Sequence, residues 1–144
     1  MTEYIPPTIG WVAKQVEEME SSGGTRGLEL LDTGLPCILV THRGNKTGAI
    51  RKIPLMRVKK DDSYVLVGSM GGQPKNPVWV YNLRAHPDVE IRDATEVMPM
   101  RVREILDDAE RAPLWELCVE AFPTYAEYAA KTTRKLPVFL AEPR

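Results

Sequence analysis

Residues 42–82 read HRGNKTGAIRKIPLMRVKKDDSYVLVGSMGGQPKNPVWVYN, and this stretch is the most informative part of the chain for its fold. It contains two basic turns, a hydrophobic strand that ends in small residues, and a helix that begins at a proline. Basic turns beside a strand that ends in small residues and beside the N-terminus of a helix can form a slot for a flat, polyanionic cofactor. The sequence therefore predicts a local cofactor slot.

Short apolar runs separated by turns extend outward from this stretch and predict the strands of a meander. The expected strands cover residues 37–43, 50–59, 63–69, 89–92, 96–105 and 136–141. Residues 44–48 and 61–62 supply the turns of two hairpins. Strands dominate and no β-α-β alternation occurs, so we expect a mainly β (α+β) fold, a small closed or split β-barrel with helices at its mouth.

The N-terminal part of the chain predicts a helix over residues 8–21, which the SSGGTRG segment ends. Its apolar stripe consists of Ile9, Val12, Val16 and Met19. This stripe can pack on the domain or touch a membrane surface, although the glutamates of the helix disfavour anionic lipid. We divide the chain into an N-terminal helix and linker, residues 1–34, and a barrel domain, residues 35–144.

Two further helices are expected, over residues 77–85 and 107–121. Asn76 is the expected side-chain cap of the first helix. Spacing places three of its residues on one face: Trp79, Asn82 and Leu83. Pro113 lies inside the second helix and should bend or restart it.

Composition favours one compact domain with a single site. The chain has 144 residues, 43% hydrophobic content, and 19 Lys plus Arg against 20 Asp plus Glu, for a net charge of -1. Without a global positive field no nucleic-acid partner is expected, and any anion site must be local. No stretch approaches the roughly 20 apolar residues of a membrane span, and no signal peptide is recognisable, so the cytoplasm is the expected location.

The cysteines and histidines have ordinary structural interpretations. Cys37 and Cys118 lack metal spacing and are expected to be small buried hydrophobes. His42 and His86 lack a carboxylate or second ligand at helical spacing, so we expect surface or turn histidines. No metal site is predicted, and the hard chemistry of any enzyme must come from a cofactor.

The GNKTG turn at residues 44–48 is the candidate anion site. Its glycines let backbone N–H groups face outward. The cations close to it in the sequence are Arg43, Lys46, Arg51 and Lys52. A solvated charged hairpin is the alternative. At the end of the following strand, Gly68 and Ser69 would let a planar ring approach the backbone, although an ordinary core strand shows the same pattern.

These residues, in this order, resemble the deazaflavin-dependent nitroreductase family, whose members are split β-barrel proteins that use reduced coenzyme F420. The resemblance covers residues from about 37 to the C-terminus. The matching positions are Asn45-Lys46-Thr47-Gly48, Arg51, Pro54-Leu55, Ser69, Gly71-Gly72, Lys75-Asn76-Pro77, Trp79, Asn82-Leu83, Ala85, Pro87, Pro123, Tyr125, Tyr128 and Leu136-Pro137-Val138. The resemblance implies a flavin-reductase-like split β-barrel, flanked by helices, with coenzyme F420 as its cofactor.

The resemblance also implies where the coenzyme lies. Its phosphate and oligoglutamate tail are expected at Asn45, Lys46, Thr47, Arg51 and Lys52. Its ring and ribityl chain are expected along Ile53, Pro54, Leu55, Met56, Val67, Gly68, Ser69 and Met70. The flanking residues are expected to be Val78, Trp79, Val80, Tyr81 and Asn82, with Tyr125 near the ring. Asn45 and Met70 replace residues that are commonly basic in the family, so Arg43 or Lys52 would have to compensate.

The implied activity is hydride transfer from reduced coenzyme F420 to a quinone or nitroaromatic acceptor. Ser69, Tyr125 and Tyr128 are the candidate catalytic hydroxyls, because negative charge develops on the acceptor oxygen, and core packing is the alternative for them. An FMN-binding split-barrel oxidoreductase and a non-catalytic coenzyme F420 carrier stay open. We expect a monomer or homodimer in the cytoplasm, with weak peripheral contact at the inner face of the cell membrane as the alternative.

Overall fold

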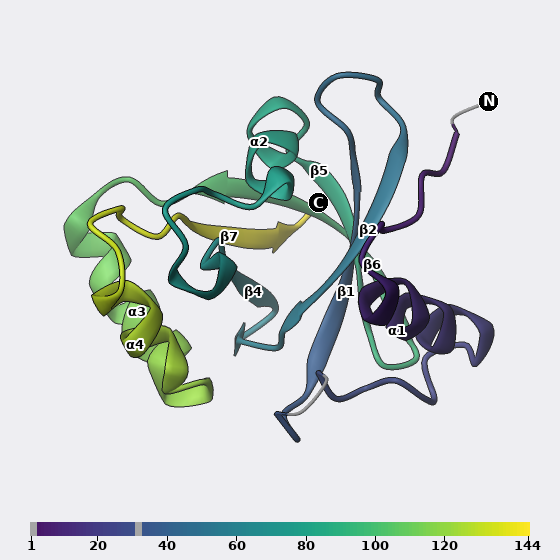
Figure 1. Ribbon diagram of the computed structural model, residues 1–144, viewed down its shortest axis with the longest axis horizontal. Helices are drawn as coiled ribbons and strands as arrows, with labels where there is room; N and C mark the ends of the chain where they lie inside the picture. The colour runs from purple at the N-terminus through teal and green to yellow at the C-terminus, as the bar shows by residue number, and fades with distance from the viewer. Residues whose placement is uncertain (1–2, 31–32) are drawn as a thin grey trace.

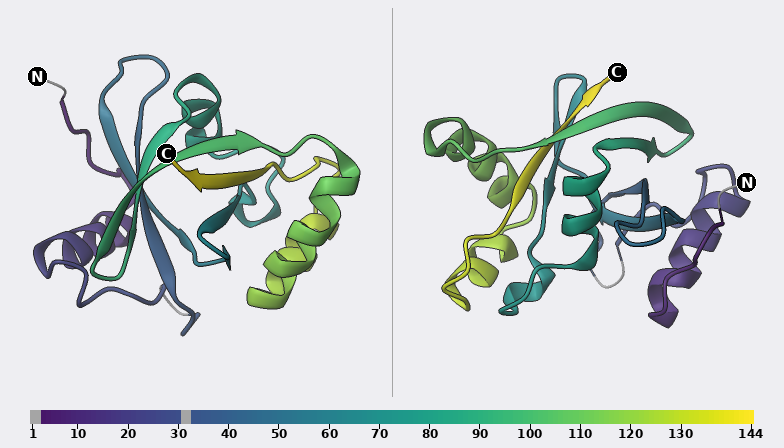
Figure 2. Two further views of the ribbon diagram at one scale, coloured as in Figure 1. Left: turned by 180° about the vertical axis from the view of Figure 1, so that it is seen from behind. Right: turned by 90° about the horizontal axis from the view of Figure 1, so that it is seen from above.

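A curled antiparallel sheet forms the centre of the molecule, and helices flank it (Figure 1). This computed structural model describes residues 3–30 and 33–144. Its elements in chain order are α1 Gly10–Ser21, β1 Cys37–Arg43, β2 Ile50–Met56, β3 Lys59–Lys60, β4 Ser63–Val67, the 3-10 turn η1 Met70–Gly72, α2 Val78–Ala85, β5 Asp88–Asp93, β6 Glu96–Glu104, α3 Asp108–Ala121, α4 Thr124–Ala130 and β7 Val138–Pro143. Figure 2 shows α1 and the α3–α4 pair at opposite ends of the molecule, with α2 between them.

The sheet has seven strands in the order β2-β1-β5-β6-β7-β4-β3, and every pairing is antiparallel. The expected simple meander is wrong, because β1 pairs with β5 and β4 pairs with β7. The single strand expected over residues 50–59 is also wrong. The chain leaves the ladder at Arg57 and Val58, so β2 and β3 lie at the two edges of the sheet. Val58 turns into the core at this break, which allows the sheet to curl.

The three helices expected from periodicity are present, with corrections at their ends. Asn76 does not cap α2, because its side-chain oxygen accepts a hydrogen bond from Arg134 instead. The buried face of α2 carries Trp79, Asn82 and Leu83 as predicted. Pro113 does not divide α3. It lies just beyond the first turn of that helix, so its missing N–H leaves the carbonyl of Ala109 without its intrahelical donor, and the helix still continues to Ala121.

The apolar stripe of α1 packs on the sheet. Val12, Val16 and Met19 are buried against Cys37 and Leu39. Peripheral membrane contact stays a prediction, as does the division at residue 34; residues 1–2 and 31–32 of that predicted N-terminal unit lie outside the described residues. In the described part of the chain, no helix combines the length and apolarity that a membrane crossing requires.

Both cysteines are buried and free, as expected. Burial raises the pKa of the Cys37 thiol to about 11 and that of the Cys118 thiol to about 12. Cys118 belongs to the core between the sheet and the α3–α4 pair, while a separate apolar cluster fills the space between the sheet and α2. Neither thiol is a reactive group in this fold.

One carboxylate joins three segments across the curled sheet. Asp93, at the end of β5, accepts two hydrogen bonds from Arg57 Nε at 3.0 Å each and one from the Tyr64 hydroxyl at 2.5 Å. Tyr64 lies on β4, which two strands separate from β5 in the sheet order. Burial together with this carboxylate raises the pKa of Tyr64. The Asp93 cluster therefore holds the curl between β4, β5 and the β2–β3 connection.

Replacing Asp93 by Asn should lower the free energy of unfolding by about 1–3 kcal/mol, because a charged acceptor shared by two donors is removed. Chemical denaturation of wild type and variant measures this difference. Asp88→Asn is the matched control, because it removes an ion pair with Arg101 on the exposed face and should leave stability nearly unchanged. Equal stability of the two variants would exclude the proposed role of Asp93.

Candidate functional site

A cavity of about 480 Å³ opens between the N-terminal segment, β2, the end of β4 and α2. Its volume lies in the range of small-molecule sites. Although β2 and β4 are far apart in the sheet order, both line it, because the sheet curls. The lining residues are Ile5, Pro7, Thr8, Ile9, Trp11, Val12, His42, Arg51, Lys52, Ile53, Pro54, Leu55, Val67, Ser69, Met70, Pro77, Val78, Trp79 and Asn82.

The mouth of this cavity has an apolar rim. Ile9 and Trp11, which is 44% exposed, come from the start of α1. Met70 and Val78, which is 65% exposed, come from η1 and α2. Sequence reasoning did not assign the N-terminal residues to the site, because nothing local shows that this segment reaches β2. A parallel bridge between Tyr4 and Ile50 makes that connection.

The cations of the β1–β2 hairpin are not equivalent. Lys52 lines the cavity, but it forms an ion pair with Glu20 of α1 at 2.8 Å and lies over the Tyr4 ring. Lys52 is therefore largely neutralised by α1. Arg51 also lines the cavity, and neither Arg51 nor Lys46 has an ion-pair partner among residues 3–30 and 33–144.

The hairpin turn is fixed to α2 by one buried side chain. Asn82 is 1% exposed, and its Oδ1 accepts a hydrogen bond from the backbone N–H of Asn45 at 2.8 Å. The Thr47 hydroxyl accepts from the N–H of Ala49 within the turn. Asn45, Lys46 and Thr47 lie beside the cavity and do not line it. Of the five predicted tail residues, these three therefore lie outside the slot, whereas Arg51 and Lys52 line it.

The loop that follows β4 is held by Arg134, which sequence reasoning missed. Met70, Gly71 and Gly72 all have positive φ angles, of 46°, 63° and 78°, so this turn is strained at Met70. The Arg134 guanidinium donates to the carbonyls of Ser69, at 2.8 Å, Gly68 and Gln73, and to the side chain of Asn76. These bonds position Ser69 and Met70 at the cavity.

Gly68 has a different role from the one expected. A Cβ at this position would lie 2.7 Å from Cγ2 of Val80 and 3.4 Å from the Pro137 ring. The missing side chain therefore lets α2 pack closely on β4, and Gly68 does not line the cavity. This close packing buries the side chain of Val80, which lies on the face of α2 toward the sheet.

The two candidate tyrosines pack away from the cavity. Tyr125 and Tyr128 lie on α4, with ring centroids 6.4 Å apart, and both contact Phe122. Tyr125 is buried, and neither ring lines the cavity. Met56 and Tyr81 also lie outside it. The catalytic role of the tyrosines stays a prediction.

His42 is neither a surface nor a turn residue, so that expectation is wrong. It lies on β1, is 4% exposed and lines the cavity opposite Arg51. Its pKa is lowered to about 4, mainly by burial and to a smaller extent by the positive charge of Arg51, against the opposing effect of a contact with the Val40 carbonyl. Sequence alternation on β1 could have revealed this burial, because His42 shares the face of Ile38 and Val40.

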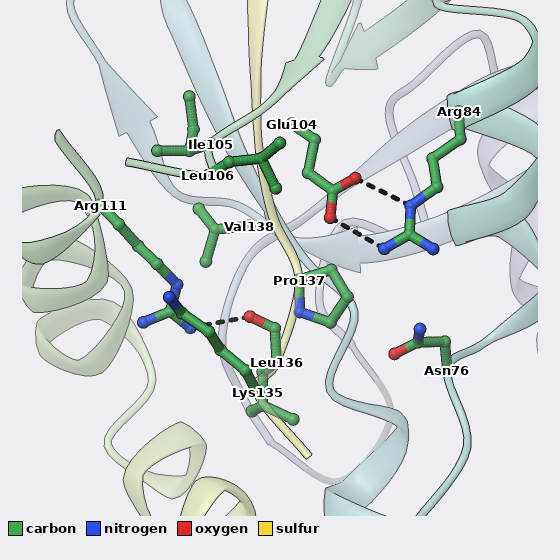
Figure 3. A pocket seen from close by; sticks show the side chains of 10 residues that line it. All are labelled: Asn76, Arg84, Glu104, Ile105, Leu106, Arg111, Lys135, Leu136, Pro137 and Val138. Atoms are coloured by element: carbon green, nitrogen blue, oxygen red, sulfur yellow. Dashed lines mark hydrogen bonds and ion pairs between the residues drawn. The ribbon is translucent and has the colours of Figure 1, made fainter. Parts of the chain in front are cut away.

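A second cavity, of about 230 Å³, lies between β6, β7, α3 and the segment before α2 (Figure 3). Its charged groups already have partners. Arg84 donates to Glu104 at 2.8 and 2.9 Å, and Arg111 donates to the Leu136 carbonyl at 2.7 Å. None of the predicted site residues lines it, so the larger cavity is the candidate site. No group of His, Cys, Asp or Glu in the part of the chain that the structure describes could hold a metal ion.

Comparison with known families agrees with this geometry. The family model of the F420H(2)-dependent quinone reductases matches residues 11–143. The chain belongs to this family. An F420H(2)-dependent quinone reductase of Mycobacterium tuberculosis is 33% identical over 105 residues, which cover 72% of this chain and 70% of the relative.

Two solved structures support the family fold. An F420-H2 dependent reductase, FDR-A, is 45% identical, with a TM-score of 0.70 over 74% of this chain and 94% of that chain. A domain-swapped dimer is 43% identical, with a TM-score of 0.73 over 92% of this chain and 98% of that chain. The predicted mainly β, split-barrel fold with flanking helices is confirmed.

The cofactor of this quinone reductase family is coenzyme F420, and the larger cavity fits it. Ile53, Leu55 and Trp79 provide apolar walls for a flat ring. Arg51, a cation without an ion-pair partner in the described chain, lies at the same cavity for an acidic group. A slot with apolar walls and one local cation suits a planar ligand with an anionic extension.

The buried His42 should make the stability of this protein depend on pH. Between pH 4 and 6.5 the unfolded state binds a proton at His42 and the folded state does not, so the free energy of unfolding rises with pH and levels off above about 6.5. The contribution is about 3 kcal/mol. Denaturant unfolding across pH 4–8 measures it, with His86→Gln as the control. Parallel curves for wild type and His42→Gln would contradict this assignment.

Proposed function

We propose that this protein transfers a hydride from reduced coenzyme F420 to a quinone or nitroaromatic acceptor, with the coenzyme in the cavity between the N-terminal segment, β2, β4 and α2. The observation that supports it most is the combination of apolar walls and one ion-pair-free cation, Arg51, in a chain of this family. When bound, the coenzyme supplies a hydride carried on a ring carbon.

The residues of the chain bind and orient the reactants. Arg51 and Lys46 hold the anionic part of the coenzyme, since Lys52 is engaged by Glu20 and cannot fully replace the cations missing at Asn45 and Met70. Ile53 and Leu55 exclude water from the ring. This division assigns charge recognition to the hairpin and ring packing to β2.

Among the three candidate catalytic hydroxyls, those of Ser69, Tyr125 and Tyr128, the one at the cavity belongs to Ser69. Its backbone carbonyl is held by Arg134, and no described residue hydrogen-bonds its side chain. Negative charge develops on the acceptor oxygen as the hydride arrives, and a hydroxyl donor at that oxygen lowers the barrier. We assign this donor role to Ser69 first, and to Tyr125 and Tyr128 only if α4 repacks on binding.

The apolar rim formed by Ile9, Trp11, Met70 and Val78 is our proposed acceptor platform. Quinone and nitroaromatic rings are flat and stack on such side chains. The sequence left a monomer and a homodimer open, and the likeness to a domain-swapped dimer supports the homodimer.

The purified protein with reduced coenzyme F420 should oxidise it only when menadione or a nitroaromatic is added, which absorbance of the oxidised coenzyme follows. Tight binding without acceptor-dependent oxidation would identify a carrier. FMN retained on purification, with no binding of coenzyme F420, would identify the flavin alternative. Oxidation with menadione alone would restrict the acceptors to quinones.

Replacing Arg51 or Lys46 by Ala should weaken coenzyme binding by about 1–3 kcal/mol for each charge-assisted hydrogen bond that the substitution removes. Fluorescence titration at low salt measures the Kd. Arg101→Ala, which removes an exposed cation on β6, is the control and should leave the Kd unchanged. Unchanged affinity in Arg51→Ala would move the anion site elsewhere.

Trp11→Ala should raise the KM for menadione about three- to tenfold, because the acceptor loses an aromatic stacking partner. The Kd of the coenzyme should not change, since Trp11 lies at the rim. Steady-state kinetics measures the KM, and Val97→Ala, which removes an exposed apolar group from β6, is the control. An equal KM in Trp11→Ala would remove the rim from the acceptor site.

A further inference from the structure

Two polar side chains at the cavity lack protein partners for one of their atoms. His42 is 4% exposed and Asn82 is 1% exposed. The Oδ1 atom of Asn82 accepts a hydrogen bond from the backbone N–H of Asn45, and no described residue accepts one from Nδ2 of Asn82. His42 Nδ1 lies 3.3 Å from the Val40 carbonyl, and no described residue bonds to Nε2. No fully buried side-chain nitrogen among the described residues lacks a partner, so both atoms reach the cavity surface.

The contact with Val40 fixes the tautomer of His42. A carbonyl oxygen only accepts, so the imidazole proton lies on Nδ1 and Nε2 is left as an acceptor. Burial lowers the pKa of His42 to about 4, so the ring stays neutral near pH 7 and keeps this acceptor. The cavity therefore offers an acceptor at His42, an amide donor at Asn82, and the cation of Arg51 opposite His42 in the β1–β2 register.

We propose that His42, with Asn82, recognises a hydroxyl group of the coenzyme's ribityl chain at the end that carries the phosphate. The inference rests on the proposed function, because it takes coenzyme F420 as the ligand. A hydroxyl both donates to Nε2 and accepts from Nδ2. An ionised phosphate only accepts, so it would leave Nε2 unpaired, and it is the group that Arg51 binds.

Binding of three deazaflavins to wild type and His42→Leu tests this assignment. The three ligands are complete coenzyme F420, the ribityl deazaflavin without phosphate, and the same ring with a methyl group in place of the ribityl chain. His42→Leu should bind the first two about tenfold more weakly and the third with unchanged affinity, because only the first two contain the hydroxyls. Arg51→Ala should lose affinity for the complete coenzyme alone. His86→Leu is the control.

A second readout does not require the variant to fold. In wild type labelled with ¹⁵N histidine, saturation with the ribityl deazaflavin should shift the Nε2 resonance of His42 in the direction of an accepted hydrogen bond. An unchanged resonance at saturation would overturn the proposal. An equally large loss of affinity of His42→Leu for the ligand with the methyl group would also overturn it. Failure of wild type to bind any deazaflavin would instead overturn the proposed function, so the two failures are distinguishable.

Discussion

The curl of the sheet is the constraint on which the site depends, and Asp93 holds it. Its carboxylate accepts from Arg57 in the β2–β3 connection and from Tyr64 on β4, so segments that are remote in the sheet order stay close. If the sheet were flat, β2 and the end of β4 could not face one cavity. The interruption of the strand at Arg57 and Val58 and the Asp93 cluster therefore act together. The interruption allows the sheet to curl, and the carboxylate holds the curl in place.

A second layer of polar contacts positions the walls once the sheet is curled. Asn82 connects α2 to the hairpin turn over 37 residues of sequence, and Arg134 connects the loop after β4 to the segment before β7. Both side chains use backbone groups of loops that would otherwise be unsatisfied. Gly68 completes this layer, because only a residue without Cβ lets Val80 of α2 approach β4. These side-chain contacts therefore fix the loops that form part of the cavity walls, because the loops lie outside the backbone hydrogen bonding of helices and strands.

The sequence predicts local structure here better than it predicts contacts. Periodicity located α1, α2, α3 and most strands, because each depends on neighbours within a few residues. The break at Val58 was missed because residues 50–59 contain no Gly, Asn or Asp that would mark a turn. Arg134 and His42 were missed because their roles depend on partners distant in sequence, such as the Ser69 carbonyl and the cavity itself. Family resemblance supplied the coenzyme, but it did not reveal that Lys52 is engaged by Glu20.

That ion pair determines which of the cations at the cavity stays available to an anionic ligand. Glu20 of α1 lies 2.8 Å from Lys52, which lines the cavity, and 3.7 Å from Arg92 of β5, so both cations share one carboxylate. Arg51, one residue before Lys52, keeps its charge available to a ligand. Since α1 also places Trp11 at the rim, the same helix removes charge from one side of the cavity and adds apolar surface at its mouth. The cavity therefore has apolar walls interrupted by a few polar side chains, which are Arg51, Lys52, His42, Asn82, Ser69 and Thr8. Under the proposed function, the apolar walls shield the flat ring and its acceptor from water.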